Sequence, residues 1–167
     1  MRANRWSGAV ASTRRADGRG AAAAYSYRND PRVPAFPDER PLMVFDGDCV
    51  VCSAGARFVL RHDRKARHRL AVTQSPLGRA LYAHYGLDPD RTNLLVMDGR
   101  AHTGSEAVLG VVRNLGPPWS SLWLARLIPR GLREALYRPF ARNRYRWFGR
   151  RDVCMVPPPG AAERFLS

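Results

Sequence analysis

The sequence has almost no lysine: of its 28 basic residues only Lys65 is a lysine, and the rest are arginines. A net charge of +14 would by itself favour a nucleic acid or an anionic membrane surface as the partner. Alanine, glycine and proline are abundant beside arginine, however, and this skew is typical of a GC-rich coding sequence. We therefore expect a solvated basic surface and no specific nucleic-acid site.

Long hydrophobic runs are also missing. No uninterrupted apolar stretch approaches the roughly 20 residues that span a bilayer, which excludes an integral membrane protein. A length of 167 residues suits one domain with a sizeable core and modest tails. The chain has only three cysteines and no signal-like apolar segment ahead of Pro41, so we expect the reducing cytoplasm as its compartment.

Sustained apolar periodicity is absent from residues 1–40, which hold several glycines and prolines and a four-alanine run. This composition predicts a disordered or loosely attached extension. The first sixteen residues are rich in arginine and free of acids, like a mitochondrial transit peptide, but the acids from Asp17 onward break that pattern. We expect one structured domain over residues 41–155 and a flexible tail over residues 156–167.

Strand and helix patterns alternate from Pro41 onward. Residues 42–45 form a short apolar run that ends in a turn-prone Asp-Gly-Asp, and they predict a buried strand. Helical spacing follows over residues 51–62, with Asp48 as the expected N-cap. Residues 70–73 predict a second strand, parallel to the first, and Ser75 and Pro76 begin a second helix.

Two further strands are expected on either side of Asp98 and Gly99, a dipeptide favoured in two-residue hairpins, so this pair should be antiparallel. Ser105 is the expected cap of the next helix, which Gly116 ends. The order β-α-β-α-β-β-α is that of a single α/β thioredoxin-like domain. Residues 119–149 add a helical segment rich in arginine and aromatic side chains.

The chemistry centres on the sequence Cys49-Val50-Val51-Cys52 at the start of the first expected helix. Two cysteines at this spacing have Cα atoms about 5 Å apart, within the range of a disulfide. Free N–H groups and the helix dipole favour a thiolate at Cys49. We expect Cys49 to be the more exposed nucleophile, and Cys52, nearer the core, to resolve the mixed disulfide.

Asp46 is the predicted proton acceptor for Cys52, because it ends the buried strand just before the cysteine pair. Partial desolvation there should raise its pKa toward neutrality. The alternative for Asp46 is a turn-forming role alone, and for Asp48 a role as turn residue and helix cap is the expectation. No basic residue separates the two cysteines, so we expect a reductant-like or isomerase-like potential.

Asp46 to Cys52, followed by a helix, resembles the signature of the DCC family of thiol-disulfide oxidoreductases, named for an Asp-x-x-Cys-x-x-Cys pattern. Similar stretches extend the resemblance to Cys154; they are residues 74–78, 105–108, 127–129 and 141–149. The resemblance implies a thioredoxin-like fold and disulfide exchange by Asp46, Cys49 and Cys52, with thiols and disulfides as partners and no cofactor. Broader thioredoxin relatives carry a cis-proline before the third core strand, where this chain has Thr92 and Asn93.

Other interpretations remain open. Cys49 and Cys52 with His62 and His68 approximate a zinc pattern, but one helix would separate Cys52 from His62 by roughly 15 Å. Cys154 is expected to be structural, with a resolving thiol or a third metal ligand as alternatives. A non-enzymatic module would use the residues of 119–149 to dock on an anionic membrane or an acidic partner. We expect instead that the aromatic residues of this segment pack on the sheet and its arginines stay solvated.

Overall fold

The computed structural model describes residues 24–150 and 158–167. Its sheet has five strands in the order β4-β3-β1-β2-β5. The central strand β1 pairs in parallel with β2 and antiparallel with β3; β3 pairs antiparallel with β4, and β2 pairs in parallel with β5. The strands are β1 Leu42–Phe45, β2 Arg69–Val72, β3 Leu94–Met97, β4 Arg100–Thr103 and β5 Phe165–Leu166.

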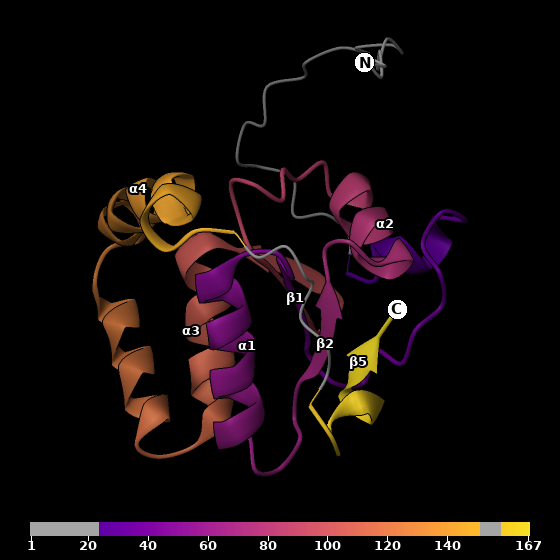
Figure 1. Ribbon diagram of the computed structural model, residues 1–167, viewed down its shortest axis with the longest axis horizontal. Coiled ribbons are helices and arrows are strands. Elements are labelled where there is room, and N and C mark those ends of the chain that lie inside the picture. Colours follow the sequence, from indigo (N-terminus) through magenta and orange to yellow (C-terminus); the bar gives the residue numbers. More distant parts are fainter. Residues whose placement is uncertain (1–23, 151–157) are drawn as a thin grey trace, which may run out of the picture.

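Helices cover both faces of this sheet. Figure 1 shows α1 and α3 together on one side and α2 on the other, with α4 lying across the end of the domain at which α1 begins. The helices are α1 Val50–His62, α2 Pro76–His84, α3 Gly104–Leu115 and α4 Arg130–Phe148, with the 3-10 helices η1 Ser26–Asn29, η2 Trp119–Leu127 and η3 Ala162–Arg164. The predicted α/β thioredoxin-like domain and its order β-α-β-α-β-β-α are confirmed.

Local sequence patterns correctly predicted where several helices and strands begin or end. Asp98 and Gly99 have φ of 51° and 71°, the left-handed values that a two-residue hairpin turn requires. Ser75 caps α2 by accepting a hydrogen bond from the Gly78 N–H at 3.0 Å, with Pro76 at the first helical position. A side chain at Gly78 would collide with the Val72 carbonyl oxygen, so glycine lets α2 start directly against β2.

The cap predicted at Ser105 is wrong. The N-cap of α3 is Thr103, and the helix begins at Gly104. Ser105 instead donates from its hydroxyl to the Glu134 carboxylate at 2.6 Å, and its backbone N–H donates to the same oxygen at 2.9 Å. A carboxylate from α4 therefore takes the place that a local side-chain cap would fill.

Alternation along the strands divides the core into two layers. On β1, Leu42 and Val44 point to the α2 side and contact Leu77 and Leu81 in one buried cluster. Leu95 on β3 points the opposite way and joins a cluster with residues of α1 and α3, namely Val59, Ala107, Val111 and Leu115. Burying each such side chain stabilises the fold by about 1.5–3 kcal/mol, so the central strands are firmly held.

The expectation of a loosely attached extension is wrong for residues 24–40. Tyr27 is buried in the core cluster on the α2 side and stacks on Phe36, with ring centroids 5.2 Å apart. Arg28 and Asp38 form an ion pair at 2.8 Å, and the Tyr27 hydroxyl also donates to Asp38. Two aromatic anchors and one shared acid fix a segment whose composition alone predicts disorder. Residues 1–23 lie outside the described part of the chain.

The flexible tail predicted over residues 156–167 is also wrong for residues 158–167. These residues add β5 to the sheet, where Leu70 pairs with Phe165. Arg164 is buried and forms an ion pair with Asp63 at 2.6 Å, while Asp63 also accepts a hydrogen bond from the backbone N–H of His68. One buried carboxylate thus ties the last residues to the loop before β2. Cys154 lies outside the described residues.

The segment of residues 119–149 is helical, as its pattern predicts, and consists of η2 and α4. Its expected division into packed aromatics and solvated arginines is only partly right. Arg133 and Arg144 are buried and ion-paired, with Glu106 and Asp46 respectively. Trp147 and Phe148, by contrast, are exposed. Neither arginine could be told from its solvated neighbours by local pattern, because both pairs join residues far apart in the sequence.

Candidate active site

The two cysteines lie at the start of α1, just after the turn that connects β1 to this helix. Cys49 is the N-cap of α1, and its sulfur accepts a hydrogen bond from the Cys52 backbone N–H at 3.3 Å. Asp48, the predicted cap, does not fill that position; the Asp48 N–H instead donates to the Asp46 carboxylate at 3.0 Å. The nucleophile predicted from the sequence is therefore itself the capping group, and one N–H of the first helical turn, that of Cys52, donates to its sulfur.

The exposure of the two thiols is the reverse of the expectation. Cys49 has no exposed surface, whereas Cys52 is half-buried. The chain after α4 returns to the cysteine pair, where Arg150 forms an isolated antiparallel bridge with Cys49 and the Val50 N–H donates to the Gly149 carbonyl at 3.5 Å. This backbone of Gly149 and Arg150, the cover strand, closes over Cys49. The sequence around the cysteine pair could not predict this contact, because Arg150 lies 101 positions after Cys49.

The pKa values of the two thiols are shifted in opposite directions. The Cys52 thiol hydrogen-bonds to Cys49 and, with the Cys52 backbone N–H and the charge of Arg144, lowers the pKa of Cys49 to about 6 against the opposing effect of burial. The same hydrogen bond, together with burial and the charge on Cys49, raises the pKa of Cys52. The pKa of Cys49 is therefore lowered and that of Cys52 raised, chiefly through the hydrogen bond between the two thiols.

Asp46 is nearly buried, at 8 % exposure, and is surrounded by donors. Its carboxylate accepts hydrogen bonds from the Tyr145 hydroxyl and from Gln74 Nε2 at 2.8 Å, and it pairs with Arg144 at 3.4 Å. Desolvation raises the pKa of Asp46, but these donors and the Asp48 N–H together outweigh it and leave the pKa below its usual value. The predicted rise toward neutrality is wrong, because the sequence shows the burial of Asp46 but not its partners.

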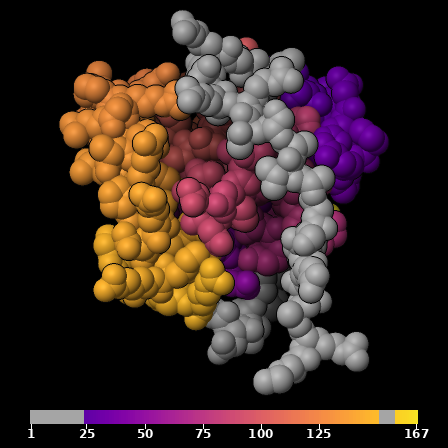
Figure 2. Space-filling view, turned by 90° about the horizontal axis from the view of Figure 1, so that it is seen from above, coloured from indigo at the N-terminus to yellow at the C-terminus, as the bar shows by residue number. Residues whose placement is uncertain are grey.

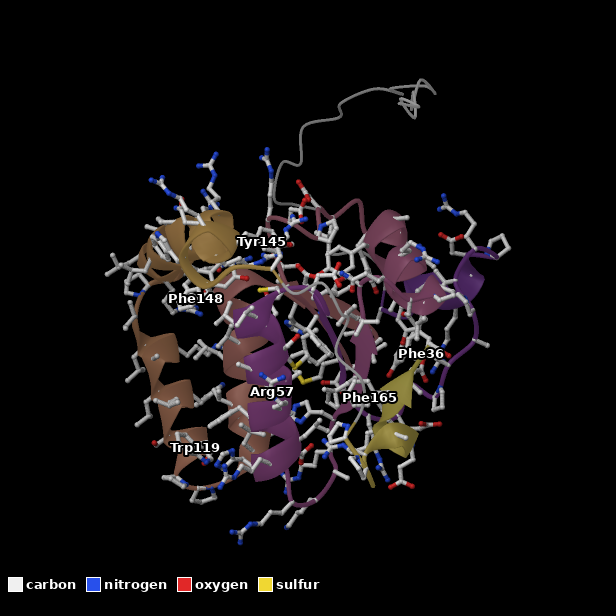
Figure 3. All side chains as sticks on the ribbon, viewed as in Figure 1. Phe36, Arg57, Trp119, Tyr145, Phe148 and Phe165 are labelled. Carbon is white, nitrogen blue, oxygen red and sulfur yellow. The ribbon has the colours of Figure 1, made fainter. Side chains whose placement is uncertain are left out.

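Gln74, Arg144 and Tyr145 are site residues that the sequence reasoning did not assign to the site. Gln74 follows β2, which lies beside β1, and Arg144 and Tyr145 come from the last turns of α4. Figure 3 shows Tyr145 at the end of the domain where α1 begins. The signal that could have found them was present, since all three fall in stretches that resemble the DCC family. Sequence position alone gives no reason to bring them to Asp46.

A cavity of about 230 Å³ lies beside the pair and is lined by Cys52, Asp46 and Arg144. The rest of its lining is mainly apolar; six of the side chains are Met43, Phe45, Val51, Tyr82, Tyr137 and Phe140. Cys49 is not part of this lining. The arrangement brings a protonated thiol, a carboxylate and a buried guanidinium to one small apolar space.

The histidines considered as metal ligands lie away from the pair. His62 is the last residue of α1 and contacts Trp119, with ring centroids 5.0 Å apart, at the opposite end of the helix from Cys49. His68 is fully buried beside Asp63, with Nδ1 3.1 Å from the carboxylate. Within residues 24–150 and 158–167 no three His, Cys, Asp or Glu residues form a group suited to a metal. Neither histidine is therefore placed to bind a zinc ion together with Cys49 and Cys52.

No helix in the described ranges combines the length and the apolar character needed to cross a bilayer.

The fold and the site define a thioredoxin-like domain with a thiolate–thiol pair at the start of its first helix. The family model of the DCC1-like thiol-disulfide oxidoreductases matches residues 43–150, and the chain belongs to this family. This confirms the resemblance seen in the Asp-x-x-Cys-x-x-Cys sequence and supports an oxidoreductase role.

Two curated relatives are similar over most of the chain. An uncharacterized protein from Bacillus subtilis, YuxK, is 35% identical over 127 residues, which cover 75% of this chain and 93% of the relative. A protein from Arabidopsis thaliana, named as a chloroplastic DCC family protein, is 38% identical over 120 residues, which cover 70% of each chain. No solved structure shows a significant match.

Proposed function

We propose that this chain is a thiol-disulfide oxidoreductase of the protein-disulfide reductase type, with Cys49 as nucleophile and Cys52 as resolving thiol. The observation that carries the proposal is the opposite shift of the two acidities, which makes Cys49 a thiolate while Cys52 keeps its proton. A reductase needs both states at once, one sulfur ready to attack and one held in reserve.

The reaction consists of two exchanges. The Cys49 thiolate attacks one sulfur of a substrate disulfide, the substrate S–S bond breaks, and the first substrate thiolate leaves. Cys52 then loses its proton and attacks the Cys49 sulfur, and the second substrate thiolate leaves and takes up a proton. Two electrons pass to the substrate, and Cys49 and Cys52 become a disulfide that an external thiol reductant must reduce again.

Asp46 is the proposed proton acceptor in the second exchange. It lines the same cavity as Cys52, and its lowered pKa keeps it ionised, while the same shift makes it a weaker base than the raised pKa expected from the sequence would have made it. The hydrogen bond to Cys49 and the charge of its thiolate both raise the pKa of Cys52. Both disappear once Cys49 is held in a mixed disulfide, so the proton becomes easier to remove at the step that needs it.

We infer that access to Cys49 requires the cover strand to open, because Cys49 has no exposed surface and its backbone pairs with that of Arg150. The Arg150 side chain is fixed from outside, by a stacking contact on Tyr145 at 4.0 Å and an exposed ion pair with Asp90 at 3.6 Å. Exposed pairs of this kind contribute little, about 0–1 kcal/mol, so the ion pair adds little to the backbone contacts that hold the cover strand closed. A substrate main chain can take the place of the cover strand beside Cys49.

A reducing compartment suits this direction of exchange, and we propose the cytoplasm, on the ground of the low cysteine content. The Arabidopsis relative is named as chloroplastic, so the family is not tied to one compartment.

The test is a redox titration of the purified protein against glutathione, with metal content measured on the same sample. The expected result is a reversible Cys49–Cys52 disulfide, lost in Cys49→Ser and Cys52→Ser and kept in Cys154→Ser. Cys52→Ser should also accumulate a mixed disulfide at Cys49 with a substrate disulfide. Stoichiometric zinc bound by the reduced pair, with no exchange, would contradict the proposal.

A further inference from the structure

The exposed apolar surface is concentrated on one part of the molecule. Within the described residues, Val108 is the one large exposed apolar side chain outside the range 122–148. We call the surface formed by η2 and α4 the η2–α4 face. Its exposed apolar members include Leu122, Leu124 and Leu127 on η2 and Leu132, Leu136, Phe140 and Trp147 on α4. The exposed fractions reach 85% at Leu127 and 68% at Leu136, far from a core position.

Helical spacing sorts the exposed half of α4 into two stripes. Leu132, Leu136 and Phe140 follow one another at intervals of four residues, and Trp147 continues the same flank. Phe140 and Trp147 are in contact, with ring centroids 6.5 Å apart. Arg138, Arg142 and Arg146 recur at the same interval on the neighbouring flank, and all three are exposed. An apolar stripe and an arginine stripe therefore run side by side along one helix.

The charge of this face has one sign. Between Trp119 and Gly149 the sequence contains a single acid, Glu134, and that carboxylate is held by Ser105. Exposed arginines continue onto η2 and the start of α4 with Arg126 and Arg130. Among the described residues, none of the five exposed arginines of the face forms an ion pair with an acid of this chain; they are Arg126, Arg130, Arg138, Arg142 and Arg146.

We propose that the η2–α4 face docks on the surface of an anionic lipid bilayer. Exposed leucines and a tryptophan flanked by arginines are the composition of segments that lie in the interface between headgroups and acyl chains. The leucines enter the acyl boundary, and the arginines contact the lipid phosphates. Positive charge spread along the whole face matches a continuous anionic surface better than the few fixed carboxylates of a protein partner. Figure 2 shows the orange-coloured residues of this region forming one side of the molecule.

Docking in this way sets the orientation of the redox site. Phe140 belongs to the apolar stripe and also lines the cavity beside Cys52. Arg144 and Tyr145, which hold Asp46, lie on the same helix. The cavity therefore opens next to the surface that contacts lipid. The docking inference itself does not depend on disulfide exchange, because it rests on exposure and charge alone.

The experiment is co-sedimentation of the full chain with vesicles of phosphatidylcholine, with and without phosphatidylglycerol. The expected result is binding to the anionic vesicles that weakens as salt is raised. Replacing Arg138, Arg142 and Arg146 together by glutamine should lower the partition coefficient on the order of a hundredfold. Leu127→Ser with Leu136→Ser should lower it at least about tenfold, and circular dichroism should show both variants folded.

The matched control is the triple change of Arg57, Arg61 and Arg64 to glutamine, which removes the same charge from exposed positions on α1 and just after it. Figure 3 shows Arg57 on α1. This control should keep most of the binding. Equal loss in both triple variants would mean that net charge alone drives binding and would overturn the proposal. Two other results, each without binding to vesicles, would also overturn the proposal. One is a dimer in light scattering that dissociates when the leucines are replaced, and the other is retention of the protein on DNA.

Discussion

The Tyr145 hydroxyl donates a hydrogen bond to the Asp46 carboxylate, across 99 residues of chain. Through this contact the last turns of α4 reach the end of β1, three residues before Cys49. The same hydroxyl accepts a hydrogen bond from Arg144 Nη2 at 2.9 Å. The environment of the cysteine pair is therefore set by two segments that lie far apart in the sequence, the end of β1 and the end of α4.

Tyr145→Phe should raise the pKa of Asp46, because it removes one of the donors that lower it. A hydrogen bond to a charged group contributes about 1.5–3 kcal/mol, so the variant should lose about that much unfolding free energy at pH 7. The loss should shrink as the pH falls through the folded-state pKa of Asp46, where the carboxylate is protonated in both proteins. Urea unfolding across pH measures this. Tyr25→Phe is the control, because the Tyr25 hydroxyl is not among the hydrogen-bond partners of Asp46, and it should show no such pH dependence.

Asp46→Asn should slow the second exchange more than the first. Attack on a substrate needs only the Cys49 thiolate, whereas release needs a proton acceptor for Cys52. Quenched exchange assays should show the mixed disulfide forming at a near-normal rate and accumulating, with the defect shrinking as the pH rises. Removing the partner of buried Arg144 should also cost about 3–5 kcal/mol of stability, so the ratio of the two rates is the readout.

Asp48→Asn is the matched control, since it removes a nearby acid that does not pair with Arg144. It should leave both rates close to those of the wild type. If Asp46→Asn resolves the mixed disulfide normally and loses only stability, Asp46 is a structural residue and Cys52 loses its proton by another route.

Alkylation should separate the acidity of Cys49 from its accessibility. The pH profile of Cys49 labelling should have its midpoint near the lowered pKa of about 6, while Cys52 should react only at high pH despite its greater exposure. Arg150→Ala should speed Cys49 labelling without moving that midpoint, because it loosens the cover strand. Mass spectrometry after brief labelling gives both rates. Faster labelling of Cys52 at neutral pH would reverse the assignment of the nucleophile.

His68 should make the fold sensitive to mild acid. Burial lowers the pKa of His68, so the imidazole takes up a proton less readily in the folded protein than in the unfolded chain, where it is protonated below a pH of about 6.5. The unfolded state then binds more protons than the folded state. The unfolding free energy therefore decreases as the pH is lowered, by up to about 1.4 kcal/mol per pH unit. Thermal unfolding of His68→Asn should show a flatter profile between pH 7 and 5 than the wild type.

Local patterns predicted the elements and their order, and they failed where a contact joins distant residues. The hairpin at Asp98 and Gly99 and the cap at Ser75 depend on neighbouring residues alone, and both are confirmed. Tyr27 and Arg164 lie in segments with no periodic pattern, yet each is buried by partners elsewhere in the chain. Periodicity reports which face of an element is buried, not which remote segment covers it.

The same distinction between local and distant contacts separates the site predictions that succeeded from those that failed. The helix position of Cys49 favoured a lowered pKa, and the pKa is lowered, chiefly by the Cys52 thiol and also by the Cys52 backbone N–H. The burial of Cys49 and the lowered pKa of Asp46 were not predictable, since they come from Arg150 and from Arg144 and Tyr145. Family resemblance marked the stretch that holds Arg144 and Tyr145, but not the contacts that it makes.

The cover strand also bears on how the protein survives peroxide. A thiolate with a pKa of about 6 is the form that hydrogen peroxide oxidises to sulfenic acid and then irreversibly to sulfinic acid. Susceptibility follows exposure as well as charge, and the Cys49 sulfur has none of its surface open. Closed, the domain keeps a reactive sulfur out of reach of small oxidants. In the proposed exchange only a molecule able to displace Arg150 reaches Cys49, so the backbone that restricts substrate access would also protect the thiolate from oxidation between reactions.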